Sequence, residues 1–181
     1  MTSVRLKGER CVVRPWHEAD VDSLAEQANN INVAKHLRDR FPHPYTRKHA
    51  QDFLKYATGL DDQSNLAIEV KGAAVGAIGY VPGNDVERFS AEIGYWLGEA
   101  FWGRGIVTEA LQLTTEHAFR ERSLLRLFAL PFAENIASAR VLEKCGYVRE
   151  GLLRSSSVKY GMPRDQWLYA RLNPAWTLPS L

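Results

Sequence analysis

The sequence predicts an α/β fold with a mixed central sheet, and three observations support this. Segments of strand type and helix type follow one another in the order β-α-α-β-β-β-α-β-α-β-β over 181 residues. Lys71-Gly72 joins two apolar segments as the turn of a hairpin would. The helices of the second half each connect two strands. Because the chain shows no repeat, low-complexity segment or linker, we expect one domain over 1–181, with 173–181 as its C-terminal tail.

The first part of the chain predicts one strand followed by helices. Pro15 ends the strand, Asn29-Asn30 breaks the first helix, and Thr46 is a typical N-cap for the last one. Prolines at 42 and 44 bias the residues before them away from helix. The expected elements are a strand over 6–14, a helix from His17 or Asp20 to Ala28, a short helix over 31–37, an extended loop over 41–45 and a helix from Thr46 to about 57.

The rest of the chain predicts strands separated by two helices. β-branched and aromatic residues between Gly, Pro and Asn indicate the strands. The near-helical spacing of Ile106, Val107 and Ala110 predicts one helix, and Asn135 and Gly146 are a typical N-cap and C-terminal glycine for the other. The expected elements are strands over 66–70, 73–81, 89–97, 125–130, 147–154 and 166–172, and helices over 105–119 and from 135 to 146.

Composition and charge exclude several classes of protein. With 45% hydrophobic and 24% charged residues, the chain is typical of a soluble globular protein. A net charge of +2 without a Lys/Arg run argues against a nucleic-acid partner. No apolar stretch approaches the ~20 residues of a membrane span, and the first residues lack the apolar core of a signal peptide. Because Cys11 and Cys145 are the only cysteines, we expect no disulfide framework and a cytoplasmic location.

The turn from Trp102 to Val107, between a predicted strand and a predicted helix, is the strongest candidate for a binding site. Gly103 and Gly105 flank Arg104 there, and glycine allows a ligand to approach the backbone closely. The first N–H groups of a helix lack internal partners and lie at its positive end, which suits a phosphate. A plain strand-to-helix joint would also use these glycines. The pattern fits neither a P-loop nor a dinucleotide fingerprint, which would have a third glycine at Thr108.

Four segments add a family resemblance in their order and spacing. They are Arg14-Pro15 with a helix opening near Asp20, residues 41–46, Glu92 to Leu97 running into 102–111, and 135–147. Over nearly its whole length the chain resembles the GNAT superfamily of acyl-CoA-dependent N-acetyltransferases, and within it the RimJ/RimL-type ribosomal-protein N-terminal acetyltransferases. The resemblance implies the GNAT fold, in which the mixed central sheet is mostly antiparallel, is splayed at the acyl-CoA site and has helices on both faces.

The resemblance also implies acetyl-CoA as co-substrate, with no metal. The glycine turn would bind the pyrophosphate, and the pantetheine arm would lie beside the splayed strand, where a backbone N–H near Trp96 or Leu97 would polarise the thioester oxygen. Val107 stands where the family usually has Gly or Ala. The residues expected to bind the co-substrate are Trp96, Leu97, Trp102, Gly103, Arg104, Gly105, Ile106, Val107, Thr108, Asn135 and Ser138.

Acetyl transfer to an amine needs a base for the ammonium proton and an acid for the leaving thiolate. Glu92 is the candidate base, through water, because it lies on the strand that would carry the thioester; a carboxylate in a salt bridge is the alternative. Many members use a tyrosine that would fall at Leu142, whereas the RimL-like branch uses a serine equivalent to Ser138. Ser138 could instead be a compatible residue in a helix capped by Asn135. The RimL-like carboxylate falls at Ser157, which cannot act as a base.

On the acceptor side, the family analogy places Tyr45 and Tyr160 in the walls of the cleft. A protein N-terminus, a free amino acid and a small amine all remain open as acceptors. Two other functions stay open as well, namely a non-catalytic acyl-CoA-binding sensor and an enzyme that uses the turn for another nucleotide. A homodimer is a further expectation from the family, and the tail around Trp176 is a candidate for its contact.

Overall fold

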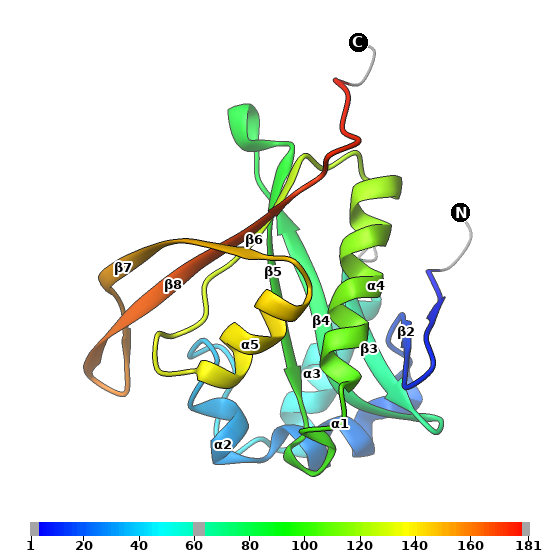
Figure 1. Ribbon diagram of the computed structural model, residues 1–181. Coiled ribbons are helices and arrows are strands. Elements are labelled where there is room, and N and C mark those ends of the chain that lie inside the picture. The colour runs from blue at the N-terminus through cyan, green and yellow to red at the C-terminus, as the bar shows by residue number, and fades with distance from the viewer. Residues whose placement is uncertain (1–3, 60–63, 179–181) are drawn as a thin grey trace. The chain divides into compact units, whose positions relative to one another are not determined.

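The computed structural model describes residues 4–59 and 64–178 (Figure 1). These residues group into two compact units. Unit 1 comprises the residues up to Gly79 together with Tyr95–Ala110, and unit 2 comprises Tyr80–Gly94 and the residues from Leu111 onward. The hydrogen-bonded strand order is β1-β2-β3-β4-β5-β6-β8-β7. β5 and β6 are parallel, and the other strand pairs with a described register are antiparallel, which confirms the mixed sheet. The single domain stays a prediction.

The first strand differs from its prediction. Residues 6–14 form two short strands, β1 (Leu6–Lys7) and β2 (Val12–Arg14), which pair antiparallel. Between them the Gly8 N–H donates to the Cys11 carbonyl at 2.9 Å, which closes a turn. The continuous strand was wrong because the backbone N–H groups of this turn are bonded to a side chain, Glu109, and not to a neighbouring strand. β2 pairs with β3 (Asn65–Val70), and β3 with β4 (Ala73–Pro82).

The first part of unit 1 contains the helical segments η1 (Glu18–Asp20), α1 (Val21–Ala28), α2 (Ile31–Ala34) and α3 (Arg47–Thr58). Of these, α1 and α3 contribute side chains to the apolar core. Thr46 caps α3 as predicted, with its side chain accepting from the His49 N–H at 3.3 Å. α2 ends at Ala34, short of the predicted 31–37. The core contains Trp16, Leu24, Ala28, Tyr45, Ala50, Leu54, Ala57, Ala67, Ala74 and Ala77.

A buried ion pair joins β2 to the start of α1. The Arg14 guanidinium donates to both Asp20 carboxylate oxygens at 2.8 Å, and its Nε donates to Glu69. Arg14 and Asp20 are 3% and 6% exposed. Burial disfavours the charged carboxylate, but the hydrogen bonds from Arg14 and from the His17 N–H outweigh it and lower the Asp20 pKa. This pair explains why Arg14-Pro15 precedes a helix that opens near Asp20.

Three further elements lead to the candidate site. They are η2 (Asp85–Glu87), β5 (Ser90–Leu97) and η3 (Glu99–Phe101), and α4 (Ile106–Glu121) follows them. In unit 2, β6 (Arg126–Ala129) pairs with β8 and α5 (Ile136–Lys144) precedes β7. β3, β4, β5, β6, α4 and α5 lie where the sequence predicted them, with ends that differ by a residue or two. No helix within 4–59 and 64–178 is long and apolar enough to cross a membrane.

The β7–β8 hairpin is longer than predicted. β7 (Val148–Lys159) and β8 (Met162–Leu172) form the long ribbon drawn in orange and red in Figure 1. Its turn uses positive φ angles of 52° at Tyr160 and 74° at Gly161. Most residues of β7 are exposed, so the strand lacks the alternation of polar and apolar residues by which a half-buried strand is predicted.

Candidate active site

The turn from Trp102 to Val107, where α4 begins, has the geometry of an anion-binding cradle. Trp102 closes it by donating its Nε1–H to the Leu97 carbonyl at 2.7 Å. Gly103 and Gly105 both have a φ of +73°, which side chains disfavour, so the turn requires glycine at both positions. The Glu109 N–H donates to the Gly105 carbonyl at 3.0 Å as α4 begins. The N–H groups just before Glu109 therefore belong to the open end of the helix, as the sequence predicted.

The side chains of the cradle differ in their exposure to solvent. Arg104 is exposed, with its Cζ 5.6 Å from the centre of the Phe101 ring, and Trp102 is 45% exposed. Ile106 is buried, and Val107 is only partly exposed. The valine therefore points partly into the packing of α4, which is compatible with a ligand site made of backbone atoms.

The parallel pairing of β5 with β6 ends at Glu92. The register runs from Ser90–Arg126 to Glu92–Phe128, and β5 continues beyond it to Leu97. β6 itself ends at Ala129. The sequence predicted a splay between these two strands without placing it at a residue, and the half-buried Glu92 lies where the described pairing ends.

The N-terminus of α5 holds the second pair of predicted residues. The Asn135 side chain accepts a hydrogen bond from the Ser138 N–H at 3.1 Å, so its predicted role as N-cap is confirmed. Ser138 is half-buried in the first turn. Leu142 is fully buried, so an apolar side chain fills the position at which many relatives carry a tyrosine. The Ser157 hydroxyl donates to the Arg164 carbonyl across the β7–β8 hairpin at 3.4 Å.

The two tyrosines predicted for the acceptor side differ in environment. Tyr45 is 6% exposed, and its ring centre lies 5.0 Å from that of Phe41, which in turn lies 5.4 Å from Trp96. Burial raises the pKa of Tyr45 to about 12. The structure thus links Tyr45 through Phe41 to the end of β5. Tyr160 is 57% exposed at the hairpin turn, where the Lys159 Nζ lies 4.6 Å from its ring centre.

The sequence analysis did not identify two residues next to the cradle, Glu109 and Arg10. The Glu109 carboxylate accepts hydrogen bonds from the turn between β1 and β2, and Arg10 of that turn lies against Gly105. Glu109 falls within a recognised segment, but nothing in the sequence links it to residues about a hundred positions earlier. Among the described residues, no group of three or more His, Cys, Asp and Glu side chains could hold a metal ion.

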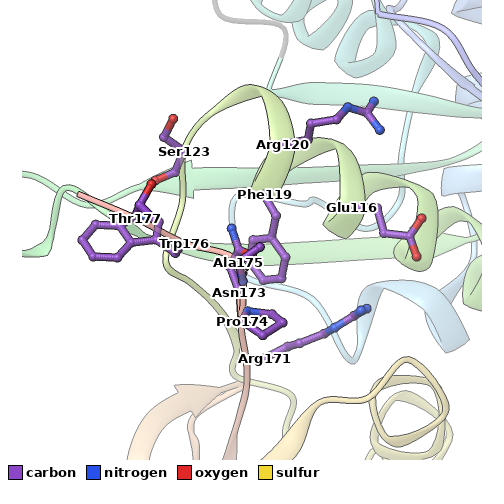
Figure 2. A pocket seen from close by; sticks show the side chains of 10 residues that line it. All are labelled: Glu116, Phe119, Arg120, Ser123, Arg171, Asn173, Pro174, Ala175, Trp176 and Thr177. Carbon is purple, nitrogen blue, oxygen red and sulfur yellow. Dashed lines mark hydrogen bonds between the residues drawn. The ribbon is translucent and has the colours of Figure 1, made fainter. Parts of the chain in front are cut away.

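Residues 173–178 of the predicted C-terminal tail pack against unit 2, and 179–181 lie outside the described residues. Asn173 donates its N–H to the Leu125 carbonyl, and Trp176 donates its Nε1–H to the Ser123 carbonyl, both at 2.8 Å. An open hollow of about 470 Å³ lies beside it (Figure 2) and contains none of the predicted site residues. Its lining residues are Glu116, Phe119, Arg120, Ser123, Arg171, Asn173, Pro174, Ala175, Trp176 and Thr177.

Comparison with known proteins gives consistent results. The family model for the acetyltransferase (GNAT) domain matches residues 10–148. A probable N-acetyltransferase of Bacillus subtilis, YjcK, is 42% identical over 85 residues, which is 47% of either chain. The [ribosomal protein uS5]-alanine N-acetyltransferase of Escherichia coli is 27% identical over 96% of the chain and 93% of its own. The structure of Mycobacterium smegmatis RimJ in complex with CoA-disulfide is 25% identical with a TM-score of 0.79, covering 94% of the chain and 86% of RimJ.

Proposed function

The chain belongs to the acetyltransferase (GNAT) family, and we propose that this N-acetyltransferase moves the acetyl group of acetyl-CoA to a primary amine, in the first place the N-terminus of a protein. The cradle carries the proposal. Its two glycines at positive φ and the open N-terminus of α4 present backbone donors, and Arg104 adds a positive charge. This combination suits the pyrophosphate of acetyl-CoA. A relative of known structure, RimJ, is described in complex with a CoA-disulfide, which supports the same ligand class.

The remaining predicted residues take roles in the transfer step. The amine nitrogen attacks the thioester carbon, the carbon–sulfur bond breaks, and the thiolate leaves with a proton. Glu92 takes the ammonium proton through water before the attack. Ser138 then protonates the thiolate and regains a proton from the attacking nitrogen, which loses its second proton as the amide forms. A backbone N–H at Trp96 or Leu97 polarises the carbonyl oxygen. Holding both substrates in line supplies much of the acceleration, up to about 7–11 kcal/mol in ideal cases.

The acceptor is proposed from the relatives and from the chemistry of the walls. The Escherichia coli relative is named for the alanine of ribosomal protein uS5, so a protein N-terminus is the first acceptor to test. Tyr45, which is buried just before α3 in unit 1, and Tyr160, which is exposed at the hairpin turn in unit 2, are the candidates for acceptor binding. We further expect a homodimer, as the family resemblance suggests, and a cytoplasmic location, where a ribosomal-protein acceptor would be met.

Release of free CoA thiol from acetyl-CoA tests this function, with mass spectrometry of the products. The panel holds peptides with different N-termini, free amino acids, polyamines and aminoglycosides. Release with one class identifies the acceptor, and a Glu92→Gln/Ser138→Ala double variant should return the rate to background. Binding of acetyl-CoA without release in the presence of any acceptor would contradict the transfer and favour an acyl-CoA sensor. Competition by NAD or ATP as strong as that by CoA would contradict the donor assignment.

A further inference from the structure

The turn between β1 and β2 is fixed to the first turn of α4 by a single carboxylate. The Glu109 side chain accepts the backbone N–H groups of Glu9, Arg10 and Cys11 at 3.0, 2.8 and 3.0 Å. A Cβ built on Gly8 would lie 2.3 Å from the Glu109 Oε2, so the carboxylate occupies the space left by that glycine. All of these residues belong to unit 1, as does the cradle.

The environment of Glu109 keeps it charged. Burial disfavours its carboxylate, but the hydrogen bonds from the Arg10 and Glu9 N–H groups and from Cys11 outweigh this and lower its pKa. Cys11 is buried, with its Sγ 3.4 Å from the Glu109 Oε2. Glu109 is therefore a fixed anion whose contacts determine where the β1–β2 turn lies.

This arrangement brings the side chain of Arg10 to the cradle. A Cβ built on Gly105 would lie 3.3 Å from the Arg10 Nε and 3.5 Å from its Cδ. The Arg10 side chain therefore lies against Gly105, on the side to which a Cβ would point. Its Nη1 is 3.6 Å from carboxylate oxygens of Glu9 and Glu109, longer than a hydrogen bond. The Arg10 side chain is 52% exposed, so these ion pairs contribute little to stability.

We propose that Arg10 binds a phosphate group of the acyl-CoA donor together with the backbone N–H groups of the cradle, and that Glu109 is its positioning residue. The inference rests on the proposed function, because it needs a CoA ligand in the cradle. A guanidinium can bind a phosphate with two parallel hydrogen bonds, which backbone donors complement. Arg104 is part of the cradle itself. Arg10 is a second cation, and it comes from the β1–β2 turn, far earlier in the sequence.

Calorimetric titration with CoA tests the proposal on the wild-type chain and on Arg10→Gln, with Arg47→Gln as matched control. Arg47 is also an arginine of unit 1, and it forms an exposed ion pair with Asp22 at 2.8 Å. We expect Arg10→Gln to bind CoA about 5- to 20-fold more weakly, as for a partly screened charged hydrogen bond, and to show a weaker salt dependence. Arg10→Lys should lie between, and Arg47→Gln should bind as wild type. The acetyl-CoA KM should rise for Arg10→Gln while kcat stays unchanged.

Dephospho-CoA, which lacks the 3′-phosphate, identifies the phosphate that Arg10 contacts. A defect of Arg10→Gln that disappears with dephospho-CoA assigns Arg10 to the 3′-phosphate, and a defect that persists assigns it to the pyrophosphate. Glu109→Gln should also weaken CoA binding, and its effect should largely vanish when Arg10→Gln is already present, because both changes remove the same contact.

Three results would count against this inference. Arg10→Gln that binds CoA within 2-fold of wild type, with the same salt dependence, would overturn it and leave the proposed function intact. Additive effects of Arg10→Gln and Glu109→Gln would overturn the positioning role of Glu109. A wild-type chain that does not bind CoA would overturn the donor assignment and this inference together. Circular dichroism spectra and melting curves of all variants separate these results from a loss of folded protein.

Discussion

The cradle in unit 1 and the β7–β8 hairpin in unit 2 use their side chains in opposite ways. Around the cradle, a charged side chain binds backbone: Glu109 accepts three N–H groups of the β1–β2 turn. On the hairpin, the strands are held by their own ladder, and large apolar side chains face solvent. The most exposed are Val148, Val158, Met162, Tyr160 and Leu172, at 67%, 62%, 59%, 57% and 57%.

The difference indicates that the cradle suits binding of the co-substrate and that the hairpin suits contact with the acceptor. A site that must bind one constant co-substrate benefits from groups fixed before binding, because ordering them on binding would weaken the affinity. An exposed ribbon with apolar side chains suits contact with a macromolecular acceptor, and changes on it cost little stability. Variants in the two regions should therefore differ in kind: those of unit 1 should lower stability or donor affinity, and those of the hairpin should alter acceptor use.

The largest effect is expected for Asp20→Asn, in the buried ion pair of unit 1. The change leaves the buried Arg14 guanidinium with one carboxylate, Glu69, and removing a partner from a buried pair costs several kcal/mol. We expect a loss of about 3 kcal/mol in the free energy of unfolding, measured with urea at pH 7. Asp22→Asn is the control, since Asp22 pairs with Arg47 in solvent and its loss should cost less than about 1 kcal/mol. Equal effects of the two variants would contradict this account.

Glu109→Gln should have the next largest effect, and it should depend on pH. At pH 7 we expect a loss of about 1–3 kcal/mol, because an amide is a poorer acceptor for three N–H groups. The pKa of Glu109 is lowered in the folded chain, so its stabilisation is complete above the pKa of the unfolded chain and is lost as the pH falls through the folded pKa.

Urea unfolding between pH 7 and pH 3 measures this linkage. The gap in unfolding free energy between wild type and Glu109→Gln should narrow toward pH 3. Glu116→Gln on the same helix is the control, because Glu116 is exposed and, within the described part of the chain, accepts a single hydrogen bond, from Gln112 at 3.3 Å. A gap that stays constant over this range would contradict the charged role of Glu109.

Glycines of the two regions allow a direct comparison. Gly105→Ala places a side chain at a φ of +73° and against Arg10, so we expect a loss of about 1–2 kcal/mol and weaker CoA binding. Gly151→Ala in β7 meets no atom within 4 Å, so its effect should stay within about 0.5 kcal/mol. Melting curves and CoA titrations measure both. A Gly151 variant as damaged as the Gly105 variant would show that the hairpin is as constrained as the cradle.

The same contrast explains what the sequence could predict. The cradle was predictable because its determinants are local: two glycines needed at positive φ and a helix that begins just after them. The Asn135 cap is local in the same sense. The β1–β2 turn was not predictable, because its hydrogen-bond acceptor, Glu109, lies 98 to 100 positions away.

Prediction from the sequence was also limited where a strand is exposed to solvent. β7 is exposed along most of its length, so no alternation of residues revealed how far it extends, and the prediction stopped at residue 154. Buried positions were more informative, as for Leu142, whose apolar character agrees with complete burial. The roles of Glu92 and Ser138 stay predictions, because a catalytic role depends on where a bound substrate lies.

The smallest effect on stability is expected at Tyr160, and it tests the other side of the comparison. The ring is 57% exposed at the hairpin turn, so Tyr160→Asn, which tolerates the φ of +52°, should change the free energy of unfolding by less than about 0.5 kcal/mol. If the hairpin contacts the acceptor, the KM for the acceptor should rise while the acetyl-CoA KM stays constant. Val86→Thr is the control and should change neither KM, because Val86 is 80% exposed in η2, outside the hairpin. A rise in the acetyl-CoA KM alone would place Tyr160 with the donor and end the proposed division between cradle and hairpin.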